Sequence, residues 1–112
     1  MKVAVIGSRG LIVPDLERYL PADVTEIVSG GARGVDTSAA RWARANGIPL
    51  TEFLPKYEIY GRRAPLVRNV TIVEYSDLVL AFWDGRSRGT AFVIEQCRAR
   101  GVPVKIFYPT SK

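Results

Sequence analysis

Glycines and an arginine follow an apolar run in the segment from Ser29 to Asp36. The sequence there reads Ser-Gly-Gly-Ala-Arg-Gly-Val-Asp, and a run typical of a helix, Val35–Ala45, comes next. A strand, a glycine turn and a helix in this order present backbone N–H groups and a helix N-terminus to an anion. Glycine permits the positive φ of such a turn and lets the anion approach the backbone. We therefore predict phosphate-binding roles for Gly30, Gly31, Ala32, Arg33 and Gly34.

Two charged residues of this segment have more than one interpretation. Asp36 falls in the first turn of the predicted helix, where a carboxylate favours the positive helix start. The same carboxylate can accept a hydrogen bond from a ribose hydroxyl, and we carry it as a candidate ligand-binding residue. Arg33 is either a solvated loop residue or a phosphate contact, and its three glycine neighbours favour the contact.

Two further turns place glycine next to polar side chains. One reads Gly7-Ser8-Arg9-Gly10, and the other is the seven-residue turn that begins at Asp84 and ends at Thr90. Hydroxyl and N–H groups at a helix start can bind phosphate, although Ser87 or Thr90 can also simply cap the helix. Asp84 is the carboxylate best placed to reach a sugar or to orient a water. The predicted ligand-binding residues of these turns are Gly7, Ser8, Arg9, Asp84, Gly85, Ser87, Gly89 and Thr90.

A fourth candidate region, after the three turns, is a pair of polar residues early in the third predicted helix. Arg68 and Asn69 fall early in that helix, where a guanidinium and an amide can recognise phosphate or a base. Charge at such positions is also common on solvated surfaces, and the spacing alone does not separate the two interpretations.

Five apolar, β-branched runs alternate with helical stretches along the chain. We predict strands at Lys2–Ile6, Thr25–Val28, Leu50–Leu54, Leu78–Trp83 and Val104–Phe107. We predict helices at 14–20 and 35–45, a third opened by residues 60–69, and a fourth from Thr90 to Gly101. The third should bury Leu66, Val70 and Val73, with Ile72 out of phase, and residues 55–61 should form a loop. Trp42, Trp83 and Cys97 are expected in the core.

This alternation predicts an α/β fold with a parallel sheet and helices on both faces, as one domain over residues 1–112. Ligands of such sheets bind at the carboxyl ends of the strands, where strand order reverses. The loops after the first, second and fourth strands are therefore expected to meet.

Composition narrows the possible settings and partners. The net charge is +5, and twelve of the sixteen basic residues are arginines, which suits an anionic ligand. One cysteine and no histidine make a transition-metal site hard to build, so we expect no metal and no cofactor. No apolar run approaches the roughly 20 residues of a membrane helix, and no signal pattern opens the chain. We expect a cytoplasmic protein with no membrane partner.

Taken together, these turns resemble the SLOG superfamily of Rossmann-like nucleotide-binding proteins, and within it the small YspA/YpsA-related proteins. The resemblance rests on Gly7-Ser8-Arg9, the Ser29–Asp36 stretch, Tyr60-Gly61, Arg68-Asn69, and Asp84-Gly85 with Ser87 and Gly89-Thr90. It implies one three-layer Rossmann-like domain with five parallel strands in the order 3-2-1-4-5. The Ser29–Asp36 stretch is also similar to the corresponding turn of the DNA-processing protein A family, which binds single-stranded DNA.

One departure from the superfamily bears on activity. The lonely-guy phosphoribohydrolases carry a Gly-Gly-x-Gly-Thr-x-x-Glu motif whose glutamate serves N-glycosidic cleavage. Here Val93 occupies the glutamate position, and Glu95 lies two residues further along the predicted helix, turned away from that face. Cleavage of such a bond needs a carboxylate beside the developing oxocarbenium ion. If the protein is an enzyme, its catalytic residues are therefore Asp84 or Asp36.

The sequence favours binding of a nucleotide or nucleotide-derived ligand by a sensor or carrier. The first alternative is an N-glycosidic hydrolase or transferase acting on nucleoside phosphates or NAD-type ligands. The second is binding of single-stranded nucleic acid, which a calculated pI of about 9.7 favours and the absence of a long basic tract disfavours. We also expect the chain to form a homo-oligomer, namely a dimer.

Overall fold

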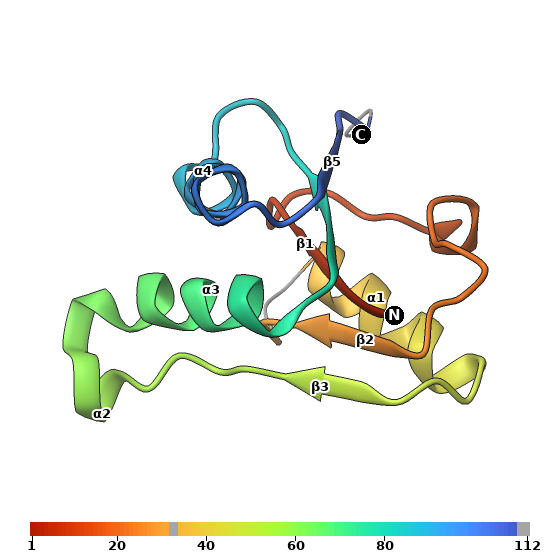
Figure 1. The fold of residues 1–112 in the computed structure, drawn as a ribbon, viewed down its shortest axis with the longest axis horizontal. Helices are drawn as coiled ribbons and strands as arrows, with labels where there is room; N and C mark the ends of the chain where they lie inside the picture. Colours follow the sequence, from red (N-terminus) through yellow and green to blue (C-terminus); the bar gives the residue numbers. More distant parts are fainter. Residues whose placement is uncertain (32–33, 110–112) are drawn as a thin grey trace.

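A computed structural model describes residues 1–31 and 34–109, and its five strands form one parallel sheet. The strands are β1 (Lys2–Gly7), β2 (Glu26–Ser29), β3 (Leu50–Glu52), β4 (Leu78–Phe82) and β5 (Val104–Phe107). Their order in the sheet is β3-β2-β1-β4-β5, which confirms the predicted α/β architecture and strand order (Figure 1). Strand ends differ from the predicted ones by no more than two residues.

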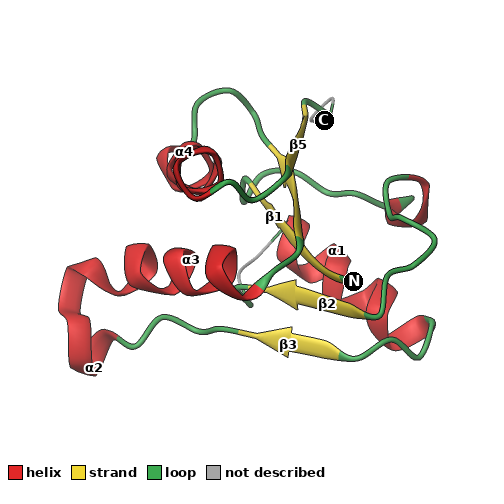
Figure 2. Ribbon diagram, viewed as in Figure 1, coloured by secondary structure: helices red, strands yellow, loops and turns green. Residues whose placement is uncertain are grey.

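Two apolar clusters cover the two faces of this sheet. One packs α1 (Val35–Ala45) and the connection between β1 and β2 against Val3, Val5 and Leu80. The other packs α3 (Ala64–Tyr75) and α4 (Arg88–Arg100) against Ala4, Val79 and Ala81. Consecutive residues of β1 and β4 therefore alternate between the clusters, as strands covered on both faces do. Figure 2 shows helices on both sides of the strands.

Cys97 and the two tryptophans lie where the core prediction put them, although to different degrees. Cys97 is fully buried on α4, and burial raises the pKa of its thiol to about 11, so the thiol stays protonated at neutral pH. Trp42 and Trp83 are only partly buried and pack against the margins of the two clusters. None of the described helices combines the length and apolar content needed to cross a membrane.

The prediction of a helix at residues 14–20 is wrong. The structure has a single 3-10 turn there, Leu16–Arg18, inside an otherwise irregular connection. Pro21 disfavours the α conformation of the residue before it, and the connection covers the sheet by burying Leu11, Val13 and Leu16 from an irregular chain. The face of the sheet that carries α1 is therefore completed by a loop.

The region from residue 55 to residue 72 also differs from its prediction. The expected loop contains the one-turn helix α2 (Tyr57–Tyr60) and a 3-10 turn, Gly61–Arg63. In α3 Ile72 is fully buried, whereas Leu66 is 43% exposed, which reverses the predicted roles of these two residues. The physical reason is that the second half of α3 packs on the sheet, while its first half extends past the carboxyl ends of the strands together with α2 (Figure 1).

Candidate functional site

A cavity of about 470 Å³ lies at the carboxyl ends of the strands, where the connections from β1 and β4 leave toward opposite faces. This is the position at which open α/β sheets bind their ligands. Eleven of the predicted ligand-binding residues line it: Gly7, Ser8, Arg9, Gly30, Asp36, Arg68, Asn69, Asp84, Ser87, Gly89 and Thr90. Segments far apart in sequence thus meet at one edge of the sheet.

The other predicted site residues fall outside this lining. Gly31, Gly34 and Gly85 are not among the residues that line the cavity. Ala32 and Arg33 lie outside the described residues, so their predicted phosphate contacts stay predictions.

Serine hydroxyls join the wall formed by β1 to the wall formed by β4. The Ser8 and Ser87 Oγ atoms lie 2.7 Å apart, and the Ser8 Oγ accepts a hydrogen bond of 3.2 Å from the Asp84 N–H. Ser87 donates onward to the Thr90 Oγ1 at 3.1 Å. Ser8 is 3% exposed and Thr90 5% exposed, so these hydroxyls are positioned by their surroundings before any ligand arrives.

Asp84 shapes the turn between β4 and α4. Its Oδ1 accepts hydrogen bonds of 2.8 Å from the N–H groups of Ser87 and Arg86. These backbone donors hold the pKa of the Asp84 carboxyl below its ordinary value, although the side chain is exposed. The indole Nε1 of Trp83 donates to the Ser87 carbonyl at 3.0 Å and fixes the same turn from the other side.

The first turn of α4 faces the cavity through Gly89 and Thr90. The first N–H groups of an α-helix have no partner within the helix and carry partial positive charge. In the described structure the Ser87 side chain does not cap α4, because its hydroxyl is bonded to Ser8 and Thr90. The alternative interpretation, in which the side chain of Ser87 or Thr90 only caps the helix, is therefore not what the structure shows.

Arg68 reaches from α3 across the carboxyl ends of β2 and β3. Its Nη1 donates to the Gly30 carbonyl at 2.7 Å and to the Phe53 carbonyl at 3.4 Å, while its Nε donates to the Asn69 Oδ1 at 2.8 Å. Burial lowers the pKa of this guanidinium, and the negative charge of Asp36 opposes that effect. A partly desolvated cation of this kind gains from a further anionic partner.

Gly30 lies between the two charged groups of this wall. A Cβ on Gly30 would lie 2.5 Å from the Arg68 Nη1 and 3.1 Å from the Asp36 Oδ2. Asp36 is 7% exposed in the first turn of α1. The absence of a side chain at Gly30 therefore allows a guanidinium and a carboxylate to approach the same point of the backbone.

Apolar side chains that sequence reasoning did not assign to the site form the rest of the wall. Ile6, Pro65, Ile72 and Val93 line the cavity together with Gly10. Val93 is 2% exposed there, whereas Glu95 is exposed on another side of α4. Apolar residues at helical spacing carry no signal that separates a cavity wall from a core, so the sequence did not indicate this part of the wall.

The charged side chains that line the described cavity are of both signs: Arg9 and Arg68 are cations, and Asp36 and Asp84 are carboxylates. Among residues 1–31 and 34–109, no three His, Cys, Asp or Glu side chains come together as metal ligands. The carboxylates of the cavity, Asp36 and Asp84, come from α1 and from the turn after β4, and the pKa of Asp84 is lowered. A general acid needs a raised pKa, so Asp84 is not prepared to donate a proton.

A family model described as YAcAr, the YspA, cpYpsA-related SLOG family, matches residues 1–60. The chain belongs to this family. The matched part of this SLOG family member contains the turns after β1 and β2, whereas Arg68 and the turn after β4 lie beyond it.

Two individual proteins are similar to this SLOG family member. Gene 61 protein of Mycobacterium phage D29 is 39% identical over 84 residues, which cover 70% of this chain and 67% of the phage protein. The crystal structure of TM1055, a structural genomics target, superposes with a TM-score of 0.66 over 92% of this chain and 71% of that one. At 21% identity the second similarity supports the fold alone.

Proposed function

We propose that this protein binds a nucleotide or a nucleotide-derived ligand in the 470 Å³ cavity, as a sensor or carrier. The observation that carries the proposal is the meeting of three kinds of group in one cavity: the first turn of α4, the hydroxyls of Ser8 and Thr90, and the guanidinium of Arg68. Helix N-termini, hydroxyls and arginine are the groups with which proteins hold phosphate.

The proposed ligand lies with its phosphate against the first turn of α4 and Arg9, because anions are stabilised at a helix start. Its sugar or base then packs on the apolar wall that includes Ile72 and Val93. The volume of the cavity is within the usual range of small-molecule sites, which combine apolar walls with convergent polar groups.

Binding is favoured over cleavage by the surroundings of Asp84 and by the hydrocarbon side chain at Val93. Asp84 is engaged by two backbone N–H groups and has a lowered pKa, and Val93 presents a hydrocarbon to the cavity. Hydrolysis of an N-glycosidic bond needs a carboxylate next to the sugar carbon. The proposal therefore predicts a ligand that is released unchanged.

The direct test is calorimetry with AMP, GMP, NAD, ADP-ribose and cyclic nucleotides on the wild type and on Arg9→Ala and Arg68→Gln. Each variant removes one cation from the cavity, and we expect affinity to fall about 10- to 100-fold, as the loss of a charge-assisted hydrogen bond does. Arg44→Ala removes the same charge from the exposed end of α1 and should leave affinity unchanged.

Three results would contradict the proposal. They are no binding of any ligand of the panel, equal losses in Arg44→Ala and Arg9→Ala, and release of a free base during the titration. Binding of single-stranded DNA in place of nucleotides, with a steep dependence on salt, would favour the nucleic-acid alternative.

A further inference from the structure

A second cavity, of about 180 Å³, lies on the other side of the first half of α3. Phe53 and Leu54, which follow β3, form one side of it, and Tyr60 of α2 and Thr71 of α3 contribute further parts of the lining. Apart from Thr71 and the two cations Lys56 and Arg68, the residues that line it are aromatic or aliphatic. This is the composition of a site for a planar ring, because rings stack on aromatic side chains and on guanidinium groups.

Arg68 belongs to the walls of both cavities. Its hydrogen bonds to the carbonyls of Gly30 and Phe53 hold the guanidinium over the ends of β2 and β3, between the two spaces. A ligand that occupies both cavities would therefore pass this cation, which would neutralise a phosphate on one side and meet a ring on the other.

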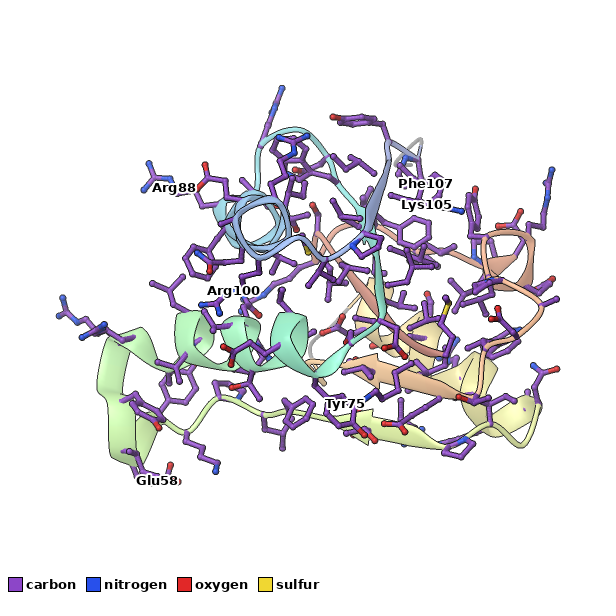
Figure 3. All side chains as sticks on the ribbon, viewed as in Figure 1. Glu58, Tyr75, Arg88, Arg100, Lys105 and Phe107 are labelled. Carbon is purple, nitrogen blue, oxygen red and sulfur yellow. The ribbon has the colours of Figure 1, made fainter. Side chains whose placement is uncertain are left out.

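The mouth of the second cavity exposes apolar side chains that a bound ring would cover. Leu54 is 59% exposed and Tyr60 45% exposed, and both line the cavity. The neighbouring Tyr57 on α2 is 57% exposed. Apolar side chains gathered at one place on a surface commonly mark a binding site, because their burial is favourable. Glu58 of α2 is not among the residues that line this cavity, and in Figure 3 its side chain points away from the sheet.

The spacing of the strands sets the length of a ligand that reaches both sites. From the loop after β4 to the loop after β3 there are three strand spacings, about 14 Å in all. This exceeds the separation of phosphate and base in a nucleoside monophosphate. A diphosphate that joins a nucleoside to a second sugar covers it.

We propose that the second cavity is a ring-binding subsite of the same site, and that the ligand is a nucleoside diphosphate derivative. This inference rests on the proposed function. The diphosphate extends from the first turn of α4 to Arg68, and the base enters the space between Phe53, Tyr60 and the guanidinium of Arg68.

The inference can be tested with a substitution that fills the second cavity and leaves the lining of the first unchanged. Thr71 is exposed, lines the second cavity and is absent from the lining of the first. Thr71→Phe places a ring in the second cavity, and Thr71→Ala removes the same hydroxyl without filling it. Both variants lose the hydrogen bond from Thr71 to the Val67 carbonyl, so they are matched in this respect. Calorimetry then compares ADP-ribose with AMP on all three proteins.

We expect the wild type and Thr71→Ala to bind ADP-ribose at least about tenfold more tightly than AMP. With its phosphate at α4, AMP is too short for its base to reach the second cavity, whereas the base of ADP-ribose gains the stacking energy there. Thr71→Phe should lose this advantage and keep its affinity for AMP. Equal affinities for ADP-ribose and AMP in the wild type, or equal losses for both ligands in Thr71→Phe, would overturn the inference and leave the proposed function standing. Failure of both ligands to bind the wild type would overturn both.

A second copy of the chain is the competing occupant of this surface. Sedimentation of the wild type and of Thr71→Phe distinguishes it from a ring. If the substitution dissociates an oligomer and changes neither affinity, the surface serves self-association and the inference is wrong.

Discussion

Gly7 and Gly34, in the turns after β1 and β2, differ from Gly85 and Gly89, in the turn after β4, in what surrounds them. A Cβ on Gly7 would lie 2.5 Å from the Phe82 carbonyl and 2.6 Å from the Val35 Cγ2. A Cβ on Gly34 would meet the backbone carbonyls of Arg9 and Leu11. In contrast, a Cβ on Gly85 or Gly89 would have no atom within 4 Å in the described structure.

Glycine-rich turns of similar sequence therefore arise from two causes. At Gly7 and Gly34 the absence of a side chain lets segments of the chain pack closely against each other, as glycine does where a strand meets a helix in this class of fold. In the third turn the space beside the backbone is left open, and polar side chains hold the turn instead. An open space at a helix start is the feature that a ligand would use.

The largest effect on stability is expected for Gly34→Ala, which adds a methyl group to a closely packed turn. Gly34 has φ = 72° and ψ = −117°, a conformation that L side chains rarely adopt, and its Cβ would lie 2.8 Å from the Leu11 carbonyl. Strain and overpacking together should lower the free energy of unfolding by about 3 kcal/mol in urea titrations. Gly10→Ala, which has open space, is the matched control and should change it by less than about 0.5 kcal/mol. Equal effects at the two positions would show that packing does not distinguish them.

Ser8→Ala tests whether polar side chains hold the third turn. The substitution removes a buried hydroxyl that bonds Ser87 and accepts from the Asp84 N–H. We expect a loss of about 1–2 kcal/mol in the free energy of unfolding, because a backbone donor is left without its partner. Thr71→Ala removes an exposed hydroxyl and should cost much less. A Ser8→Ala protein as stable as Thr71→Ala would contradict the network.

Asp84→Asn separates the charge of that side chain from its hydrogen bonds. Backbone hydrogen bonds from Ser87 and Arg86 hold the pKa of Asp84 below its ordinary value in the folded state, so its contribution to stability is present at neutral pH and is lost as pH falls through the folded pKa. The amide oxygen of asparagine still accepts from Ser87 and Arg86. Thermal unfolding from pH 7 to pH 3 should therefore show the Tm difference between wild type and variant shrinking in acid. A difference that stays constant with pH would assign the role of Asp84 to its shape alone.

The smallest effect on stability is expected for Gly89→Ala, together with a distinct effect on binding. Gly89 lies in the first turn of α4 with no positive φ, so alanine should be neutral or stabilise the helix by up to about 1 kcal/mol. Its methyl group would stand at the edge of the cavity and hinder a phosphate. Affinity for the nucleotide found by calorimetry should fall while the Tm does not. If affinity is unchanged, the phosphate does not lie at this helix start.

Much of the fold could be predicted from the sequence because its strands are short apolar runs separated by glycine turns. The order of the strands was implied by the family resemblance and is confirmed. The connection at 14–20 could not be predicted, because a loop that buries Leu16 and a helix that buries Leu16 have the same pattern. The extension of α3 past the carboxyl ends of the strands could not be predicted for a related reason. An apolar residue such as Leu66 carries no signal of whether a sheet lies beneath it.

The candidate site could be predicted where a turn announces itself by glycine and hydroxyl residues. Ser8, Ser87 and Arg68 were predicted from type and position, and the structure brings them to one cavity. Their partners could not be predicted, because the bond from Arg68 to the Gly30 carbonyl joins residues 38 positions apart. The apolar wall at Ile72 and the second cavity could not be predicted either, because both depend on how α3 crosses the carboxyl ends of the strands.

The pair of hydroxyls at Ser8 and Ser87 joins residues 79 positions apart in the chain. A partly folded molecule that has formed β1, β2 and α1 but has not yet added β4 contains only one half of the candidate site. Any ligand held there can bind only after the slow, long-range closure of the chain, and its binding energy is then added to the stability of the whole native state. Ligand should accordingly slow global unfolding, as measured by hydrogen exchange throughout the sheet, more than it changes the fraying of any one loop.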